Sequence, residues 1–94
     1  MASMGDKRMH NRTNIMARAQ ALWVDSAGML HEAPAMLEDT SPSGASMRLK
    51  ESIGVGSKVR IKWRRGQFLG IVRHVKRQES DYMVGIERDE GVTL

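Results

Sequence analysis

Cysteine is absent from this 94-residue sequence, which excludes disulfide bonds and thiolate metal sites and fits a reducing compartment. Long apolar runs are absent too, since none approaches the roughly 18 residues that a membrane-spanning helix needs. The polar segment of residues 1–12 lacks the apolar core of a signal peptide. From these absences we expect a cytoplasmic protein with no membrane span.

Patterns typical of catalysis or metal binding are lacking as well. His10, His31 and His74 are scattered without the spacing of metal ligands, so we expect no bound metal. No serine–histidine–acid or paired-carboxylate arrangement is evident. We therefore expect a binding protein that is not an enzyme and carries no cofactor.

What the sequence does contain is an excess of basic residues, with a formal net charge of +4. That balance favours anionic partners such as nucleotides, nucleic acids or anionic membrane surfaces. The length allows one domain at most. We place this domain at residues 15–88, after a basic arm at residues 1–14 that we expect to be flexible and before a tail at residues 89–94.

Hydrophobic patterning within the domain predicts strands. The clearest case is the alternation of Val59, Ile61 and Trp63 with lysine and arginine. Short apolar segments separated by Gly, Ser and Asp turn signals favour an all-β sandwich or barrel, and closure into a barrel hides strand edges. We expect six strands, at residues 15–24, 29–38, 45–50, 58–63, 67–75 and 82–87.

Two of these segments contain a residue that disturbs a regular strand. Pro34 predicts that the segment 29–38 is an edge strand or carries a bulge, and its Ala, Leu and Met content leaves a short helix as the rival interpretation. The strand is favoured because the turn signal at residues 25–28 joins it to its predecessor as a hairpin. Gly70 predicts a bend or bulge in the segment 67–75.

The basic arm contains Arg8 and Arg12 in the pattern Arg-x-x-x-Arg. Guanidinium groups match phosphate in a bidentate manner and hydrogen-bond the O6/N7 edge of guanine, so the pair can clamp an anion. The same spacing recurs at Arg60 and Arg64, and on its own it is more typical of a solvated basic tail. The pair acquires meaning only together with a second motif.

That second motif is Asp-x-Ser-x-x-Gly at Asp39, Ser41 and Gly44, in a run of turn-forming residues between two predicted strands. The plain alternative is an ordinary turn, in which Asp and Ser cap backbone groups and Gly adopts a positive φ. With the arginine pair before it and strands after it, the motif resembles that of the PilZ domain family. The segments 70–73 and 82–87 are similar to the family's last two strands.

The resemblance spans nearly the whole chain and implies a six-stranded antiparallel β-barrel of PilZ type that binds cyclic di-GMP, a bacterial second messenger. It implies signalling through a downstream protein partner, by a monomer or a ligand-induced dimer. Lys7, directly before the arginine pair, is implied as an accessory residue that supports an intercalated pair of ligands. Thr40 and Ser43 depart from the family, which often carries an aliphatic residue and a glycine there.

The resemblance also assigns a role to each residue of the two motifs. Arg8 and Arg12 suit the phosphates and the Hoogsteen edges of the guanines. Asp39 can accept hydrogen bonds from the N1–H and N2–H₂ groups of guanine. Ser41 supplies a hydroxyl in the same loop, and Gly44 lacks a Cβ where backbone and ligand must approach closely.

An alternative function arises from residues 58–77, which contain many lysines and arginines but no acid. They could form a nucleic-acid-binding face of a small β-barrel, with Trp63 or Phe68 stacking on bases. The simpler interpretation is the solvated outside of barrel strands with both aromatic rings in the core, and it is favoured because basic and apolar residues alternate. A scaffold that acts through protein contacts alone is the third class of function.

Overall fold

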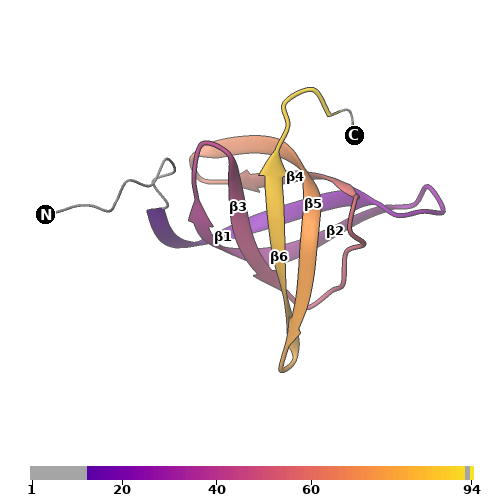
Figure 1. Ribbon diagram of the computed structural model, residues 1–94, viewed down its shortest axis with the longest axis horizontal. Helices are drawn as coiled ribbons and strands as arrows, with labels where there is room; N and C mark the ends of the chain where they lie inside the picture. Colours follow the sequence, from indigo (N-terminus) through magenta and orange to yellow (C-terminus); the bar gives the residue numbers. More distant parts are fainter. Residues whose placement is uncertain (1–12, 93) are drawn as a thin grey trace, which may run out of the picture.

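Six β-strands make up the structure, a computed structural model that describes residues 13–92 and residue 94 (Figure 1). This part of the chain contains no helix, and hence none long and apolar enough to cross a membrane. The expected all-β class is therefore confirmed. The strands are β1 (Thr13–Val24), β2 (Leu30–Thr40), β3 (Gly44–Leu49), β4 (Lys58–Trp63), β5 (Gly66–Gln78) and β6 (Asp81–Arg88).

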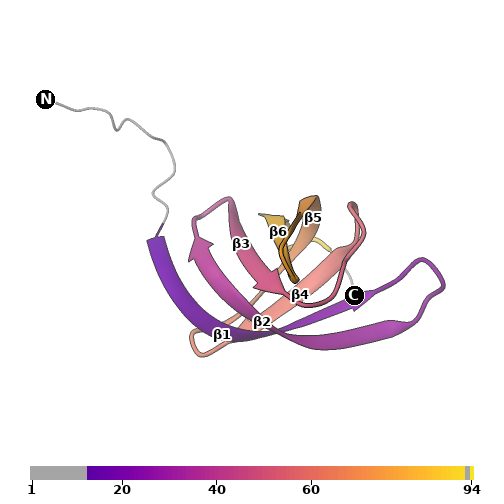
Figure 2. The ribbon, with the colours of Figure 1, turned by 90° about the horizontal axis from the view of Figure 1, so that it is seen from below.

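The strands close into an antiparallel barrel in the order β1-β2-β3-β6-β5-β4, with β4 pairing back onto β1. β1 to β3 form one meander and β4 to β6 a second, and the meanders are joined along β3–β6 and β1–β4. β3 and β4 lie on opposite walls, so the segment 50–57 crosses one end of the barrel (Figure 2). The expectation of a closed six-stranded antiparallel barrel is confirmed.

The barrel interior is filled by the side chains that alternate inward along each strand. Most inward side chains of β1 and β2 are alanines, such as Ala21 and Ala33, with Trp23 and Leu37 as the exceptions, whereas β3 to β6 contribute mostly larger ones such as Met47 and Ile61. A barrel of few strands is narrow, so the alanine wall leaves room for the large side chains opposite. The largest fully buried side chains are Leu37, Met47, Ile53, Ile61, Val59, Val72 and Val84.

Pro34 lies where the sequence predicts an edge. It is opposite Gln20 of β1, but β3 begins to pair with β2 only at Met36. The missing N–H of Pro34 therefore removes no hydrogen bond between β2 and β3. The segment is a strand and not the rival helix, and Gly28 at φ +86° completes the hairpin turn that joins it to β1.

The irregularity in β5 does not lie at Gly70, as the sequence suggested. Gly70 pairs regularly with Val59 and Arg88, and the register shifts instead between Val72 and His74. Gly70 is needed for a different reason, because a Cβ there would overlap the backbone of β6. β5 is also longer than expected, since its polar end continues to pair with β6 in a projecting hairpin.

Candidate functional site

The Asp-x-Ser-x-x-Gly motif forms the hairpin turn between β2 and β3. The Ser41 N–H donates to the Gly44 carbonyl at 2.8 Å, and the Gly44 N–H donates to the Ser41 carbonyl at 3.3 Å. Pro42 and Ser43 are left as the two residues of the loop. The Arg88 N–H donates to the Ser43 carbonyl at 2.9 Å, which ties this turn to the end of β6.

Ser41 is buried, with 7% of its surface exposed. Its hydroxyl oxygen accepts hydrogen bonds from the Ser43 N–H at 3.3 Å and from the Gly44 N–H at 3.2 Å. This is the local side-chain-to-backbone bonding that serine favours in turns. The structure therefore places the Ser41 hydroxyl against the backbone of its own turn, where it holds the loop in shape.

Gly44 lies at a close approach between β3 and β6. A Cβ on Gly44 would overlap the carbonyl oxygen of Ile86, so no larger residue fits without a shift of backbone. Its φ does not lie in the left-handed region, so the turn alternative is incorrect in this detail: close approach, not a positive φ, explains this glycine. The approaching group in the structure is a strand of the barrel itself.

Asp39 is half-buried near the end of β2 and lies opposite Asn14 of β1 and Ser46 of β3. Ala45 and Met47 on either side of Ser46 point into the core, so Ser46 faces outward. Directly opposed residues share a face of the sheet, which places Asp39 on the outer face beside the turn. Of the three motif residues, it is the one whose side chain lies on the outer face and is not fully buried.

The other predicted binding residues, Lys7, Arg8 and Arg12, lie outside the described residues. The strand that follows them is informative nevertheless. β1 begins at Thr13, and Thr13 is opposite Thr40, inside the Asp-x-Ser-x-x-Gly motif. The chain therefore enters the barrel beside the motif turn.

A hollow of about 430 Å³ adjoins this turn on the outer face of β3, β6 and β5. Its polar lining includes Ser43, Ser46, Arg73, His74 and Glu87, and the Arg73 Nε donates to a Glu87 carboxylate oxygen at 2.6 Å. No motif in the sequence marks Ser46, Arg73 or His74 as site residues. The alternation within 45–50 predicts that Ser46 faces outward. Arg73 and His74 come near it through the pairing of β5 with β6 and the register shift in that pairing, which no local pattern of residues indicates.

A larger hollow, of about 830 Å³, lies between the β1–β2 hairpin and the 50–57 crossover, and none of Asp39, Ser41 and Gly44 lines it. The His31 ring stacks on Trp23 at 5.3 Å, and its Nε2 lies 2.7 Å from an Asp25 carboxylate oxygen. That hydrogen bond, together with those from backbone N–H groups of the turn, lowers the pKa of Asp25. We assign Asp25 and His31 to the hairpin's own structure.

The strands β4 and β5 combine exposed basic side chains with aromatic rings that are buried or partly buried. Lys58 and Lys62 are exposed and Arg60 is half-buried, as expected for the outside of a barrel. Phe68 is only 3% exposed and lies beneath the Arg88 guanidinium, whose carbon is 4.3 Å from the ring centre. Phe68 is therefore not available to stack on a base, and Trp63 is partly buried against the core.

Within the described part of the chain, no group of three or more His, Cys, Asp or Glu side chains could hold a metal ion. No protein-family model matches the chain, and no curated protein matches it either.

Proposed function

We propose that this chain is a cyclic di-GMP receptor of PilZ type, which signals through contacts with another protein and catalyses no reaction. One observation carries the proposal: the residue that follows Arg12 in the chain, Thr13, is opposite Thr40 of the Asp39–Gly44 motif. Consecutive Cα atoms are about 3.8 Å apart, so this register keeps the two motifs within reach of one ligand.

The chemistry of the residues suits such a ligand. The guanidinium groups of Arg8 and Arg12 match its phosphates and the O6/N7 edges of its guanines. Asp39, on the outer face, can accept the N1–H and N2–H₂ hydrogen bonds of one guanine. Ser41 and Gly44 hold the turn that presents Asp39. In this proposal residues 1–12 close over the ligand and form a new surface for a downstream protein.

Base selectivity tests the proposal most directly. Cyclic di-GMP is expected to bind at least roughly ten-fold more tightly than cyclic di-AMP, because losing one hydrogen bond to a charged group costs about that much. Adenine lacks both O6 and the N1–H donor, so Asp39 and an arginine lose their partners. Isothermal titration calorimetry with both dinucleotides, and with GTP and cyclic AMP as further controls, measures the difference. Equal affinities would rule out the readout by Asp39.

Nucleic-acid binding by β4 and β5 is the second candidate function. One observation favours it: Arg60 is opposite Leu22 and Leu69, and Lys62 is opposite Gln20 and Gln67, so no acid faces these two residues across the sheet. The burial of Phe68 weighs against it, because a stacking platform for bases is a common part of single-strand recognition.

Replacing both Arg60 and Lys62 by Gln separates the two functions. The double variant is expected to bind cyclic di-GMP within about two-fold of the wild-type affinity, because neither residue belongs to the proposed site. A two-fold change in affinity corresponds to less free energy than one typical hydrogen bond contributes. Any nucleic-acid binding by the wild type is expected to be weak and to fall steeply with salt. Fluorescence anisotropy with labelled oligonucleotides at several salt concentrations measures it. Salt-resistant, sequence-selective binding that the double variant loses would favour the nucleic-acid function instead.

A further inference from the structure

A bulge in β5 places two neighbouring polar side chains on the outer face. Val72 is opposite Ile86 and His74 is opposite Gly85, so the register of β5 and β6 skips Arg73, which lies opposite no residue of β6. Normal alternation would place one of Arg73 and His74 inward, but both are exposed. A bulge characteristically re-aims a side chain in this way, and bulges are over-represented beside functional sites.

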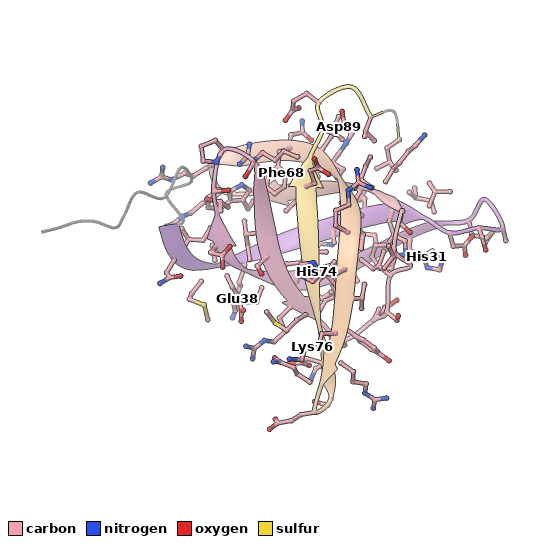
Figure 3. All side chains as sticks on the ribbon, viewed as in Figure 1. His31, Glu38, Phe68, His74, Lys76 and Asp89 are labelled. Atoms are coloured by element: carbon pink, nitrogen blue, oxygen red, sulfur yellow. The ribbon has the colours of Figure 1, made fainter. Side chains whose placement is uncertain are left out.

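The His74 ring rests directly on Gly85. If Gly85 carried a Cβ, the three heavy atoms nearest to it would all belong to that ring, namely Cε1, Nε2 and Nδ1. The ring therefore covers the glycine with one face, while the residue as a whole remains exposed. Figure 3 shows His74 over the β5–β6 wall, well separated from His31 at the projecting β1–β2 hairpin.

A row of cross-strand partners connects this ring to the candidate site. Asp39 is opposite Ser46, Ser46 is opposite Gly85, and Gly85 is opposite His74. The row crosses three strand spacings of about 4.8 Å, so Asp39 and His74 are roughly 14 Å apart along the sheet. The hollow of about 430 Å³ includes Ser46, Gly85 and His74 in its lining, and Ser43 of the motif turn as well.

We propose that His74 is a stacking platform for a purine base of the bound dinucleotide, and that Arg73 attracts a phosphate of the same ligand. This inference rests on the proposed function and extends its site to residues outside both motifs. The ligand has two bases: Asp39 would read one at the turn, and the His74 ring would support the other. Glu87, which accepts the Arg73 Nε hydrogen bond, keeps that guanidinium at the rim of the hollow.

Four single variants and one double variant distinguish a stacking role from a merely basic or merely structural one. His74→Ala is expected to weaken cyclic di-GMP binding about ten-fold, equivalent to about 1.4 kcal/mol, and to leave the melting temperature of the free protein nearly unchanged. His74→Phe retains an aromatic face and is expected to restore the affinity to within about two-fold of the wild type. Lys76→Ala, an exposed basic position on the same strand, is expected to have little effect.

The fourth single variant changes Gly85, the residue on which the His74 ring rests. Gly85→Ala is expected to push the ring out of place and to weaken binding as His74→Ala does. Combined with His74→Ala, it is expected to cause little further loss of affinity, because the side chain that it displaces is already gone. Each variant is measured by calorimetric titration with cyclic di-GMP and by a thermal melt of the free protein.

The outcomes separate this inference from the proposed function. If the wild type does not bind cyclic di-GMP, the proposed function fails and the role of His74 fails with it. If the wild type binds but His74→Ala changes the affinity no more than Lys76→Ala, the proposed function stands and the stacking role is wrong. If His74→Phe is as weak as His74→Ala, the imidazole acts by charge or hydrogen bonding, and stacking is again excluded.

Discussion

Arg12→Ala is expected to weaken cyclic di-GMP binding by roughly ten- to a hundred-fold, because a hydrogen bond to a charged group contributes about 1.5–3 kcal/mol and each 1.4 kcal/mol is a decade in affinity. The loss of a bidentate contact would lie at the upper end of this range. The melting temperature of the free protein is expected to stay the same, since the barrel closes through pairing within residues 13–88. Calorimetric titration and a thermal melt give the two quantities.

Arg64→Ala is the matched control for this variant. Arg64 belongs to a second Arg-x-x-x-Arg spacing, with Arg60, and it lies in the turn between β4 and β5. In an antiparallel barrel this turn and the β2–β3 turn are at the same end, so Arg64 also tests for general electrostatic attraction near the site. Equal losses of affinity in the two variants would mean that the arm acts only by its charge. A melting temperature several degrees lower for Arg12→Ala would make the arm part of the fold.

Gly44→Ala is expected to destabilise the barrel in the absence of any ligand. The new Cβ would overlap the Ile86 carbonyl oxygen, which belongs to the backbone of β6 and cannot rotate away as a side chain does. Overpacking typically costs about 1–3 kcal/mol, and the rigidity of this contact places the variant towards the upper value. In a domain of this size, that corresponds to a fall in melting temperature of roughly 10 °C or more.

Gly54→Ala provides the comparison. The crossover between β3 and β4 contains Gly54, where the nearest atom to an added Cβ is the Ser57 hydroxyl oxygen at an ordinary 3.6 Å. Its stability is expected to stay within about 0.5 kcal/mol of the wild type. Circular dichroism melts of the two variants test the contrast. If Gly44→Ala melts like Gly54→Ala and yet no longer binds cyclic di-GMP, the glycine serves the ligand and not the β3–β6 contact.

Local sequence signals predicted most of the fold. Alternation along 58–63 predicted β4 with its bounds unchanged, because a strand with one buried face must alternate. Turn-forming residues predicted the hairpin turns, and Pro34 predicted that its strand has an unpaired edge. These signals depend on the chain's own conformational preferences and on which side chains avoid water. Both are properties of short segments, so they can be read without knowing the partner strands.

The candidate site could be predicted only in part, for a related reason. The Asp39–Gly44 motif was recognisable, since its residues are contiguous and its turn is local. The sequence left open whether Gly44 serves a positive φ or a ligand, and the structure shows a third reason, the Ile86 carbonyl, which comes from a strand some forty residues later. The bulge at Arg73 was misplaced to Gly70 because a bulge is defined by its partner strand.

By itself, then, the sequence determined an all-β domain of six strands, the position of its turns and a polar motif in one of them. Tertiary structure alone decided which strands pair beyond the hairpins, namely β3 with β6 and β1 with β4, and in what register all of them pair. Registry across β2, β3, β6 and β5 is what aligns Asp39, Ser46, Gly85 and His74 in one row on the outer face. Such a row depends on contacts between distant segments, which form only when the hydrophobic faces of all six strands close around a common core.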